Sequence, residues 1–498
     1  MFAGNRALWL DEAMLATNFK ENSLSEMLHP PFKYVQVGAI GYMLTSKALV
    51  NLLGHSELAL RLLPLLAGCI SLLAFYRASR LVLSPTATII GVLLLGVCEP
   101  QIYYCSEVRP YSLDVLATIL ITWLSLRVIL SQYATRQIAA LVVASAALML
   151  FSATAMFVTA ASFSSLIVGC GWRARKPLIL LVGGGLLAAA VGSFHYLSYL
   201  EPQTRYYFSA ATFQSPLDGF MPLPPRSLGD LEWYVRWPLD FFVDPGGFRA
   251  HALMLIGALI GGVTIGRTSR NLLTLLVAPF AVALAASAMQ KFPFITYPHY
   301  TSHLFGRNSI YLVPIAILLA SGGLAVLFES MRPVHRWAGF ALIAVIAFHP
   351  LTATLRQIRT PVRGAQDIRP CLAFLQEHVA TGDTLVLSWM AEPPFRYYRD
   401  RFDLGTLPTI VAGDETVPTL LESSETWVRM KDWDKLRKTL DEAGNKRLWL
   451  LFSYHEDSYG LADSKFAIHE LKRRGNVKQV VRSNGAVLYQ FEPASARF

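Results

Sequence analysis

The sequence predicts a polytopic α-helical membrane protein of about ten spans, followed by a C-terminal extracytoplasmic α/β domain. The 498 residues are 53% hydrophobic and only 16% charged, whereas soluble domains carry roughly 25% charged residues. Charge is also uneven: residues 1–355 hold 23 basic and 15 acidic residues, and the shorter stretch 356–498 holds 21 and 19. Long apolar runs end where the charged stretch begins. We therefore expect a membrane domain over 1–355 and a soluble domain over 356–498.

Basic residues cluster at alternate junctions between the apolar segments, which is typical of cytoplasmic loops. The net charge of +10 lies mostly in residues 1–355, which carry +8, so it does not indicate a nucleic-acid partner. The positive-inside rule places five junctions in the cytoplasm. They are marked by Arg77/Arg80, Arg127/Arg136, Arg173/Arg175/Lys176, Arg267/Arg270 and Arg332/Arg336.

Ten apolar segments are long enough, or nearly so, to cross a bilayer. They run over 58–83, 86–105, 111–131, 137–153, 155–171, 177–199, 251–267, 271–290, 309–328 and 337–355, with no strong break inside 137–171. We expect a multi-pass protein of the cytoplasmic (inner) membrane with a periplasmic C-terminal domain. The other outward-facing parts would be 1–57, 105–111, the turn near Ser152, 200–250 and 291–308.

Residues 33–53 are nearly long enough to cross, yet we expect an amphipathic helix in the outer interface. A crossing here would put residues 1–30 on the opposite side from 105–111. At 100° per residue, four polar residues also fall on one stripe. These are Lys33, Gln36, Lys47 and Asn51. A true span with snorkelling lysines is the alternative interpretation.

The outer loop 200–250 and the tail show further organisation. The loop is rich in Pro and aromatic residues, which suits a cover at the membrane interface. Its Tyr and Trp residues include Tyr206, Tyr207, Trp233, Tyr234 and Trp237. The tail pattern predicts helices over 367–380 and 463–474, strands over 384–388, 448–452, 479–481 and 487–491, and a hairpin at Ser483-Asn484-Gly485. No phosphate-binding loop or catalytic triad is visible in the tail.

Two adjacent carboxylates, Asp11 and Glu12, form the first group of candidate functional residues, followed in the chain by His29 and Lys33. A structural interpretation is available, because Asp11 is a good N-cap for a helix over 12–28 that a His-Pro-Pro sequence would end. The functional interpretation is that a carboxylate at the outer surface serves as general base for an acceptor hydroxyl.

A second group lies at the junction before the span 111–131. Glu107 and Arg109 could simply decorate an exposed turn, where ion pairs contribute little. Asp114 is harder to explain in this way. A carboxylate about one turn inside an apolar span is costly and is functional by default.

A third group is cationic and comes from distant segments. Arg61, at the outer end of the span 58–83, could snorkel, and Arg307, before the span at 309, could anchor that span. The functional interpretation gathers Arg61, Arg307 and Lys33 into an outward-facing pocket for a lipid phosphate.

Four motifs occur in this order: Leu8-Trp9-Leu10-Asp11-Glu12-Ala13, His29-Pro30-Pro31-Phe32-Lys33, Ser56-Glu57-Leu58-Ala59-Leu60-Arg61-Leu62 and Ser106-Glu107-Val108-Arg109-Pro110-Tyr111. In this order and spacing the sequence resembles the membrane-embedded C-class glycosyltransferases (GT-C) of glycosyltransferase family 39. That family includes protein O-mannosyltransferases, lipid A aminoarabinose transferases and rhizobial lipid A galacturonosyltransferases. The resemblance covers residues 8–130 well and continues loosely through 307–314 and the tail.

The resemblance implies a GT-C fold and transfer of a monosaccharide from a polyprenyl-phosphate donor to a lipid, polysaccharide or protein acceptor. Asp11 matches the acidic position taken as general base, and Glu12 matches its supporting neighbour. Lys33 and Arg61 match positions that hold the donor phosphate. The other expected substrate-binding residues are His29, Glu107, Arg109, Asp114, Tyr300 and Arg307. The expected partners are the donor, an envelope acceptor and membrane lipids.

The implied chemistry needs few groups. Phosphate is a competent leaving group, so no paired general acid is required, and a single displacement would invert the anomeric carbon. No cofactor is expected to be required, and a divalent metal is compatible with the chemistry but not indicated. His299 and His303 have i, i+4 spacing, yet no Asp or Glu lies near them in the sequence to complete a zinc site.

The chain departs from the family pattern at its start. The family normally has a transmembrane helix before the Trp-Leu-Asp-Glu segment, whereas this chain begins eight residues before Trp9. We therefore expect the native start to lie further upstream. The alternative functions are a transporter or flippase for lipid-linked sugars and a non-catalytic binding protein. Inverted repeats and polar residues at the bilayer midplane, which a transporter would favour, are not visible.

Overall fold

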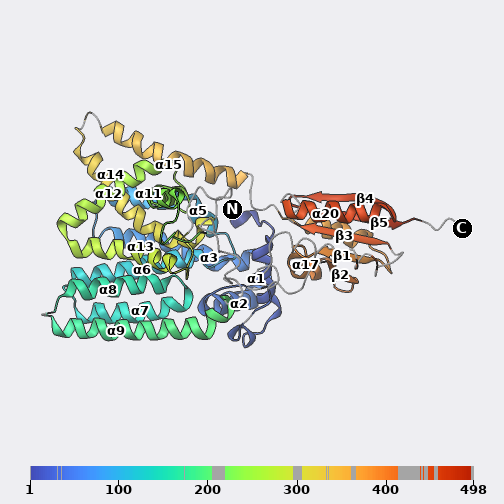
Figure 1. Ribbon diagram of the computed structural model, residues 1–498, viewed down its shortest axis with the longest axis horizontal. Coiled ribbons are helices and arrows are strands. Elements are labelled where there is room, and N and C mark those ends of the chain that lie inside the picture. The colour runs from blue at the N-terminus through green and yellow to red at the C-terminus, as the bar shows by residue number, and fades with distance from the viewer. Residues whose placement is uncertain are drawn as a thin grey trace.

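The computed structural model shows a helical bundle and a sheet domain with two short helices between them (Figure 1). These are α1 (Leu10–Glu21) and α2 (Ile40–Leu53). The residues described are 2–30, 32–34, 36–172, 174–204, 219–294, 305–332, 334, 336–359, 366–412, 438, 441, 447–453 and 458–494. The predicted class, a polytopic helical protein with a C-terminal α/β domain, is confirmed.

Helices occupy all ten predicted span positions. Within the described part of the chain, seven helical stretches are long and apolar enough to cross a membrane, while α4, α7 and α8 are shorter. The bundle consists of α3 (Glu57–Ser79), α4 (Pro85–Val97), α6 (Tyr111–Leu130), α7 (Thr135–Phe151), α8 (Ala155–Cys170), α9 (Arg175–His195), α12 (His251–Thr268), α13 (Arg270–Ala288), α14 (Val313–Ser330) and α15 (Arg336–Arg359). Nearly all residues of α14 are buried, so this helix lies at the centre of the bundle.

The apolar segment 86–105 does not form one continuous helix, because the helix breaks at Cys98. The segment forms α4 and the short α5 (Glu99–Tyr104), and Cys98 between them is extended. Pro100 explains the break: its ring would clash with the carbonyl of residue 96 in a continuous helix, but it is tolerated in the first turn of α5.

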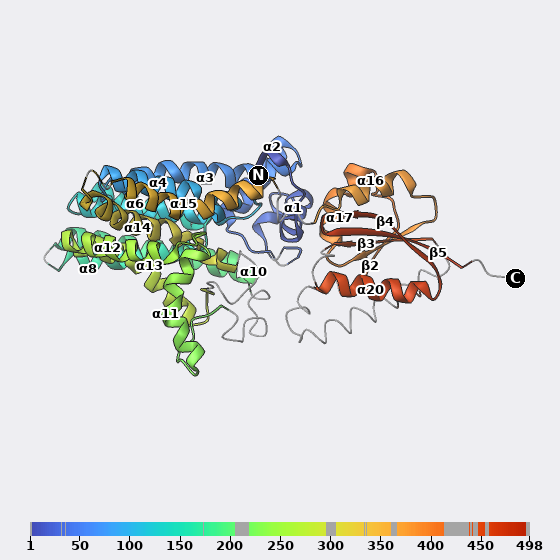
Figure 2. The same cartoon turned by 90° about the horizontal axis from the view of Figure 1, so that it is seen from above.

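The basic junctions gather at the end of the bundle away from the sheet domain (Figure 2). Asn271 Nδ2 donates to Gly169 O at 3.3 Å and Ser84 Oγ donates to Glu329 Oε1 at 3.0 Å, so junctions distant in sequence meet there. The turn at Ser152 lies at the other end, beside the start of α6, as the alternation of basic junctions predicted. The assignment of either end to the cytoplasm stays a prediction.

The segments before the first long helix differ from expectation. The helix expected over 12–28 is α1, which begins at Leu10, so Trp9 and not Asp11 is its N-cap. It ends at Glu21 and is followed by a separate 3-10 turn, η2 (Glu26–Leu28). The polar stripe expected over 33–53 is also wrong, since α2 begins only at Ile40 and Lys33 and Gln36 precede it.

The loop 200–250 contains helices that the sequence did not reveal. A π-helical turn, η3 (Tyr196–Leu200), and α10 (Glu201–Thr204) extend α9, and α11 (Leu228–Val243) follows later. Phe241 of α11 makes an edge contact with Phe280 of α13 at a centroid distance of 5.5 Å, so this helix packs on the bundle. Tyr206 and Tyr207 lie outside the described residues.

The tail forms a five-stranded sheet of order β2-β1-β3-β5-β4, in which β1, β2 and β3 are parallel and β4 and β5 are antiparallel. The strands are β1 (Thr384–Ser388), β2 (Thr409–Ala412), β3 (Leu448–Ser453), β4 (Gly475–Ser483) and β5 (Ala486–Pro493). Helices α16 (Arg369–His378) and α20 (Ser458–Lys472) cover opposite faces (Figure 2). The predicted tail helices, strands and hairpin are confirmed, while β2 was not predicted.

The tail joins the membrane domain through α17 (Glu392–Tyr398) and the 3-10 turn η7 (Arg399–Phe402), which pack on α1. Lys20 pairs with Asp400 at 2.6 Å, and Arg396 pairs with Glu21 at 2.5 Å. One hydrophobic cluster contains residues of α1, α2, α16, α17 and the sheet. The region around α1 is therefore built from both parts of the chain.

Candidate active site

Glu12 lies at the centre of a buried hydrogen-bond cluster at the sheet-domain end of the bundle. Its carboxylate is fully buried and accepts six hydrogen bonds. Arg6 donates through both terminal nitrogens at 2.8 and 3.1 Å, and Arg61 donates through Nε and Nη2 at 3.2 and 2.9 Å. Backbone N–H groups of Trp9 and Val108 supply the other two. Both oxygens of Glu12 are thus occupied by the protein.

This cluster ties three distant segments together: the start of the chain, α3 and the loop before α6. Burial by itself would raise the pKa of Glu12, but the charges of Arg6 and Arg61 outweigh it and hold the pKa below its ordinary value. Glu12 is therefore an anchor that stays ionised near neutral pH. Its environment suits support of the site, the role that the resemblance implies for it.

Asp11 faces a different environment. Its side chain keeps 24% of its surface exposed, and it lies 2.6 Å from Arg109 Nη2 and 3.8 Å from Arg307 Nη1. Arg109 comes from the loop before α6, and Arg307 from the 3-10 turn η5 (Phe305–Leu312) that leads into α14. Burial would lower the pKa of Arg109, but the adjacent Asp11 raises it above its ordinary value. One accessible carboxylate and two guanidinium groups thus meet at one point.

Glu107 contacts the segment that carries Asp11 and Glu12 through a hydrogen bond with Trp9. Its Oε1 accepts a hydrogen bond from Trp9 Nε1 at 2.8 Å, and the neighbouring carbonyl of Ser106 accepts one from Arg6 Nη2 at 3.1 Å. Glu107 is buried and so is not the exposed decoration that a structural interpretation of this turn would suggest. The loop 106–109 therefore contacts both ends of the Trp-Leu-Asp-Glu segment.

Asp114 lies one turn into α6 and is buried. Its Oδ1 accepts a short hydrogen bond, 2.5 Å, from Ser152 in the turn between α7 and α8. Ser152 Oγ in turn accepts from Ala155 N at 3.1 Å, so the carboxylate fixes the start of α8. This partner gives Asp114 a structural explanation that the sequence did not offer, beside its expected role in substrate binding.

The expected pocket of Arg61, Arg307 and Lys33 does not form as one cluster. Arg61 is only 1% exposed and is bound to Glu12 and to the carbonyls of Arg6 and Ala7. Lys33 pairs with Glu21 at 3.4 Å, at the far end of α1, roughly 13 Å along the helix from Glu12. Arg61 and Lys33 thus contact opposite ends of α1, so their side chains do not form one pocket. Arg307 alone of the three lies beside Asp11.

The remaining predicted residues lie apart from Asp11 or outside the described chain. His29 is exposed, and its Nδ1 lies 2.9 Å from Ser25 O in the turn that holds η2. Tyr300, His299 and His303 fall outside the described residues. Among the residues that the structure describes, no three His, Cys, Asp or Glu side chains are grouped so that they could hold a metal ion.

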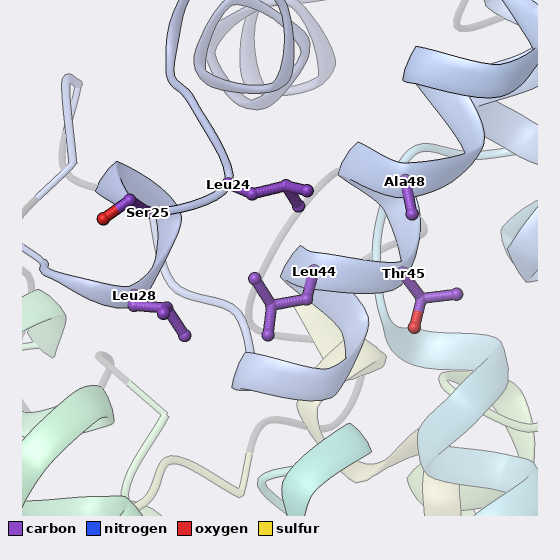
Figure 3. Close-up of a pocket in the computed structure, with 6 residues that line it drawn as sticks. All are labelled: Leu24, Ser25, Leu28, Leu44, Thr45 and Ala48. Carbon is purple, nitrogen blue, oxygen red and sulfur yellow. The ribbon is translucent and has the colours of Figure 1, made fainter.

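Two cavities lie near this region. The larger, of 530 Å³, lies between η2 and α2, where Leu28 and Leu44 face each other (Figure 3). It is lined by Leu24, Ser25, Leu28, Leu44, Thr45 and Ala48, which carry no charge to bind a phosphate. The smaller, of 240 Å³, lies between α3, α4, α5 and α6 and reaches Ser106, whose carbonyl binds Arg6. Its wall is mostly apolar, so it adjoins the charged cluster without adding charge to it.

Sequence reasoning missed Arg6 and two tail residues of this region, Gln366 and Tyr398. Arg6 lies only six positions before Glu12, and a buried carboxylate needs neighbouring cations, so the pair was a signal that could have been used. Gln366 and Tyr398 bind backbone N–H groups of Leu10 and Leu8. Nothing in local sequence predicts a contact across more than 350 residues.

Known proteins are similar to this chain in sequence or in fold. Residues 39–196 match the family described as dolichyl-phosphate-mannose-protein mannosyltransferase. ArnT from Cupriavidus metallidurans in the apo state superposes with a TM-score of 0.57 and 12% identity, over 98% of this chain and 94% of that chain. The oligosaccharyltransferase of Archaeoglobus fulgidus in the apo form gives a TM-score of 0.52 and 10% identity, over 99% of this chain and 71% of that chain.

This protein has the GT-C glycosyltransferase fold. The predicted resemblance is confirmed, and the superposition extends over the sheet domain as well as the bundle. The family match includes Arg61, Glu107, Arg109 and Asp114 of the GT-C domain, whereas Asp11 and Glu12 precede it. No curated protein matches the sequence significantly.

Proposed function

We propose that this GT-C protein is a glycosyltransferase that moves a monosaccharide from a polyprenyl-phosphate donor to an acceptor hydroxyl on the outer face of the cytoplasmic membrane. The observation that carries the proposal is the meeting of Asp11, Arg109 and Arg307 at one end of the bundle. A carboxylate that is partly exposed beside two cations from distant segments can accept a proton while the cations bind a phosphate.

The proposed reaction is a single displacement. The acceptor oxygen forms a bond to the anomeric carbon as the bond from that carbon to the phosphate oxygen breaks, and the acceptor proton passes to Asp11. Inversion at the anomeric carbon follows from this geometry. Arg109 and Arg307 stabilise the charge that develops on the departing phosphate. No cofactor takes part in the proposed steps.

The Asp11–Arg109 ion pair implies an order of events in the proposed reaction. Arg109 Nη2 lies 2.6 Å from Asp11 Oδ2. A donor phosphate would compete for this guanidinium group, and Asp11 would then be able to accept a hydrogen bond from the acceptor. Glu12 keeps its six bonds throughout, because none of them involves Arg109 or Arg307.

The solved structures with this fold support a lipid-phosphate ligand. ArnT from Cupriavidus metallidurans bound to undecaprenyl phosphate superposes with a TM-score of 0.57 and 13% identity, over 97% of this chain and 94% of that chain. The Archaeoglobus fulgidus protein has been solved in complex with a dolichol-phosphate and an inhibitory peptide. A phosphate on a long isoprenoid is thus a ligand for which this fold is suited.

Asp11→Asn tests the proposed general base. Because an amide cannot take the acceptor proton, we expect transfer to fall at least about a hundredfold in membranes supplied with polyprenyl-phosphate sugars. Asp403→Asn, an exposed tail position where the backbone has positive φ, is the matched control and should transfer normally. The protein should still insert in the membrane, and normal transfer by Asp11→Asn would reject this role.

The donor sugar and the acceptor call for a separate experiment. Mass spectrometry of envelope lipids, polysaccharides and proteins from a deletion strain should show one glycan that lacks a single monosaccharide. Restoration by the wild-type gene, but not by Asp11→Asn, would connect that glycan to this site. An unchanged set of glycans under conditions of expression would contradict the proposed activity.

A further inference from the structure

The start of α1 is completed by side chains of the C-terminal domain. Leu8 N–H donates to the Tyr398 hydroxyl at 3.0 Å, and Leu10 N–H donates to Gln366 Oε1 at 2.7 Å. Both tail residues are buried: Tyr398 has no exposed surface, and Gln366 is 7% exposed. These bonds flank Trp9, whose N–H donates to Glu12 Oε2.

These contacts matter because the first N–H groups of a helix have no partner inside that helix. A Ser, Thr, Asp or Asn normally supplies an acceptor at the N-cap, but the N-cap here is Trp9, which has none. Gln366 takes this capping function from the tail. Since Asp11 is the second residue of α1, the place at which the helix starts decides where its carboxylate points.

The Tyr398 side chain and the backbone beside Gln366 are each held by further hydrogen bonds. The Tyr398 hydroxyl donates to Glu57 Oε1 at 2.9 Å, and Arg401 binds the other oxygen of Glu57 at 2.9 Å. The residue after Gln366, Asp367, donates its N–H to Asn484 O in the turn between β4 and β5 at 2.9 Å. Contacts from groups that are themselves held in this way select one start of α1.

We propose that the C-terminal domain positions the active site by fixing the start of α1: Gln366 caps the first helical N–H, of Leu10, and Tyr398 holds Leu8, the residue before the N-cap Trp9. The effect of these contacts on catalysis rests on the function proposed above, whereas the contacts themselves do not. Tyr398 and Gln366 are positioning residues, because they reach Asp11 only through the backbone of residues 8–10. The domain thereby gains a role besides any contact with the acceptor.

Hydrogen exchange of the full-length protein in nanodiscs tests the capping directly. Tyr398→Phe and Gln366→Met keep the size of each side chain but remove the acceptor. We expect the amides of 8–12 to exchange roughly fivefold faster in each variant, with tail strands unchanged. Tyr397→Phe is the matched control, because its hydroxyl binds His55 O across the same interface at 3.0 Å without touching α1. Unchanged exchange at 8–12 in both variants would overturn the proposal.

Kinetics test the consequence for catalysis. In both variants we expect kcat to fall about tenfold while the KM for the donor changes less than about twofold, since Arg109 and Arg307 are untouched. Gln366→Glu retains an acceptor oxygen and should restore kcat, whereas equal losses in Gln366→Met and Gln366→Glu would overturn the role of that oxygen. If the wild-type protein transferred no sugar, the proposed function would fail, and the exchange experiment would still decide the capping.

Discussion

Two neighbouring carboxylates of α1 have opposite environments. Glu12 is fully buried and accepts six hydrogen bonds, while Asp11 is partly exposed and faces two arginines. Adjacent residues of a helix point about 100° apart, so a pair at the edge of a protein core divides in this way. The acidic pair thus provides one anchoring group and one group that substrate can reach.

Replacing Glu12 by Gln should lower the free energy of unfolding by about 3 kcal/mol near neutral pH, because Arg6 and Arg61 would keep buried charges without a counter-ion. The folded pKa of Glu12 lies below its unfolded value, so its stabilisation is complete above the unfolded pKa and is lost as pH falls through the folded pKa.

Thermal unfolding of wild type and Glu12→Gln in detergent, measured from about pH 7 down to about pH 2.5, checks this sign. The gap between the two melting temperatures should narrow as the solution becomes more acidic. A gap that stays constant, or that widens, would contradict the assignment of an ionised anchor.

The sequence predicted that charged residues of distant segments would meet more reliably than it predicted which of them would pair. Asp11, Arg109 and Arg307 come together as one group, but Arg61 was expected at a phosphate and lies on Glu12 instead. A charge pattern indicates that an arginine near a span needs a counter-ion. It cannot say whether that counter-ion is a ligand or a carboxylate of the same chain, because both satisfy the same electrostatics.

At the scale of single elements, hydropathy predicted the long helices well and the short ones poorly. The long apolar runs fix helix positions because a bilayer requires every backbone group to be bonded within its segment. Helices α2, α11 and α17 are held by tertiary packing, and their starts could not be read from periodicity. The crossing of α12 and α14 was also invisible, although it depends on glycines at 257, 261 and 323.

Gly323→Ala tests that crossing. A methyl group at 323 would overlap the carbonyl oxygen of Gly257, so α12 and α14 would have to separate. We expect a loss of about 2 kcal/mol in stability, seen as a lower melting temperature in nanodiscs. Gly183→Ala is the control, because a methyl group there meets nothing within 4 Å and should leave the melting temperature nearly unchanged. Equal effects of both substitutions would contradict close packing at Gly323.

At the scale of the whole molecule, the chain has one end where the basic junctions gather and another that carries α1 and the sheet domain (Figure 2). The division into a helical bundle and a sheet domain was predictable, because residues 1–355 are apolar and carry few charges whereas residues 356–498 are highly charged. The docking of α17 on α1 was not, since it depends on pairs such as Glu21 with Arg396 that lie 375 residues apart. Such pairs leave no local pattern in a single sequence.

Cysteine labelling tests the predicted sidedness. In a variant without the five native cysteines, Glu377→Cys should react with an impermeant maleimide in intact spheroplasts, because this exposed tail position is expected outside. Arg80→Cys, exposed at the basic end, should react only after the membrane is permeabilised. The reverse labelling pattern would show that the orientation is inverted.

The hydrogen bond that the Asp367 N–H donates to Asn484 O has a consequence for biogenesis. Asn484 lies in the turn between β4 and β5, far later in the sequence than α1, so α1 leaves the ribosome before this turn does. If Gln366 completes α1 only when this turn is in place, Asp11, the proposed general base, stays badly oriented until the segment that includes Asn484 has been translated and exported. A nascent or truncated protein would then occupy the membrane without transferring sugar to the wrong target.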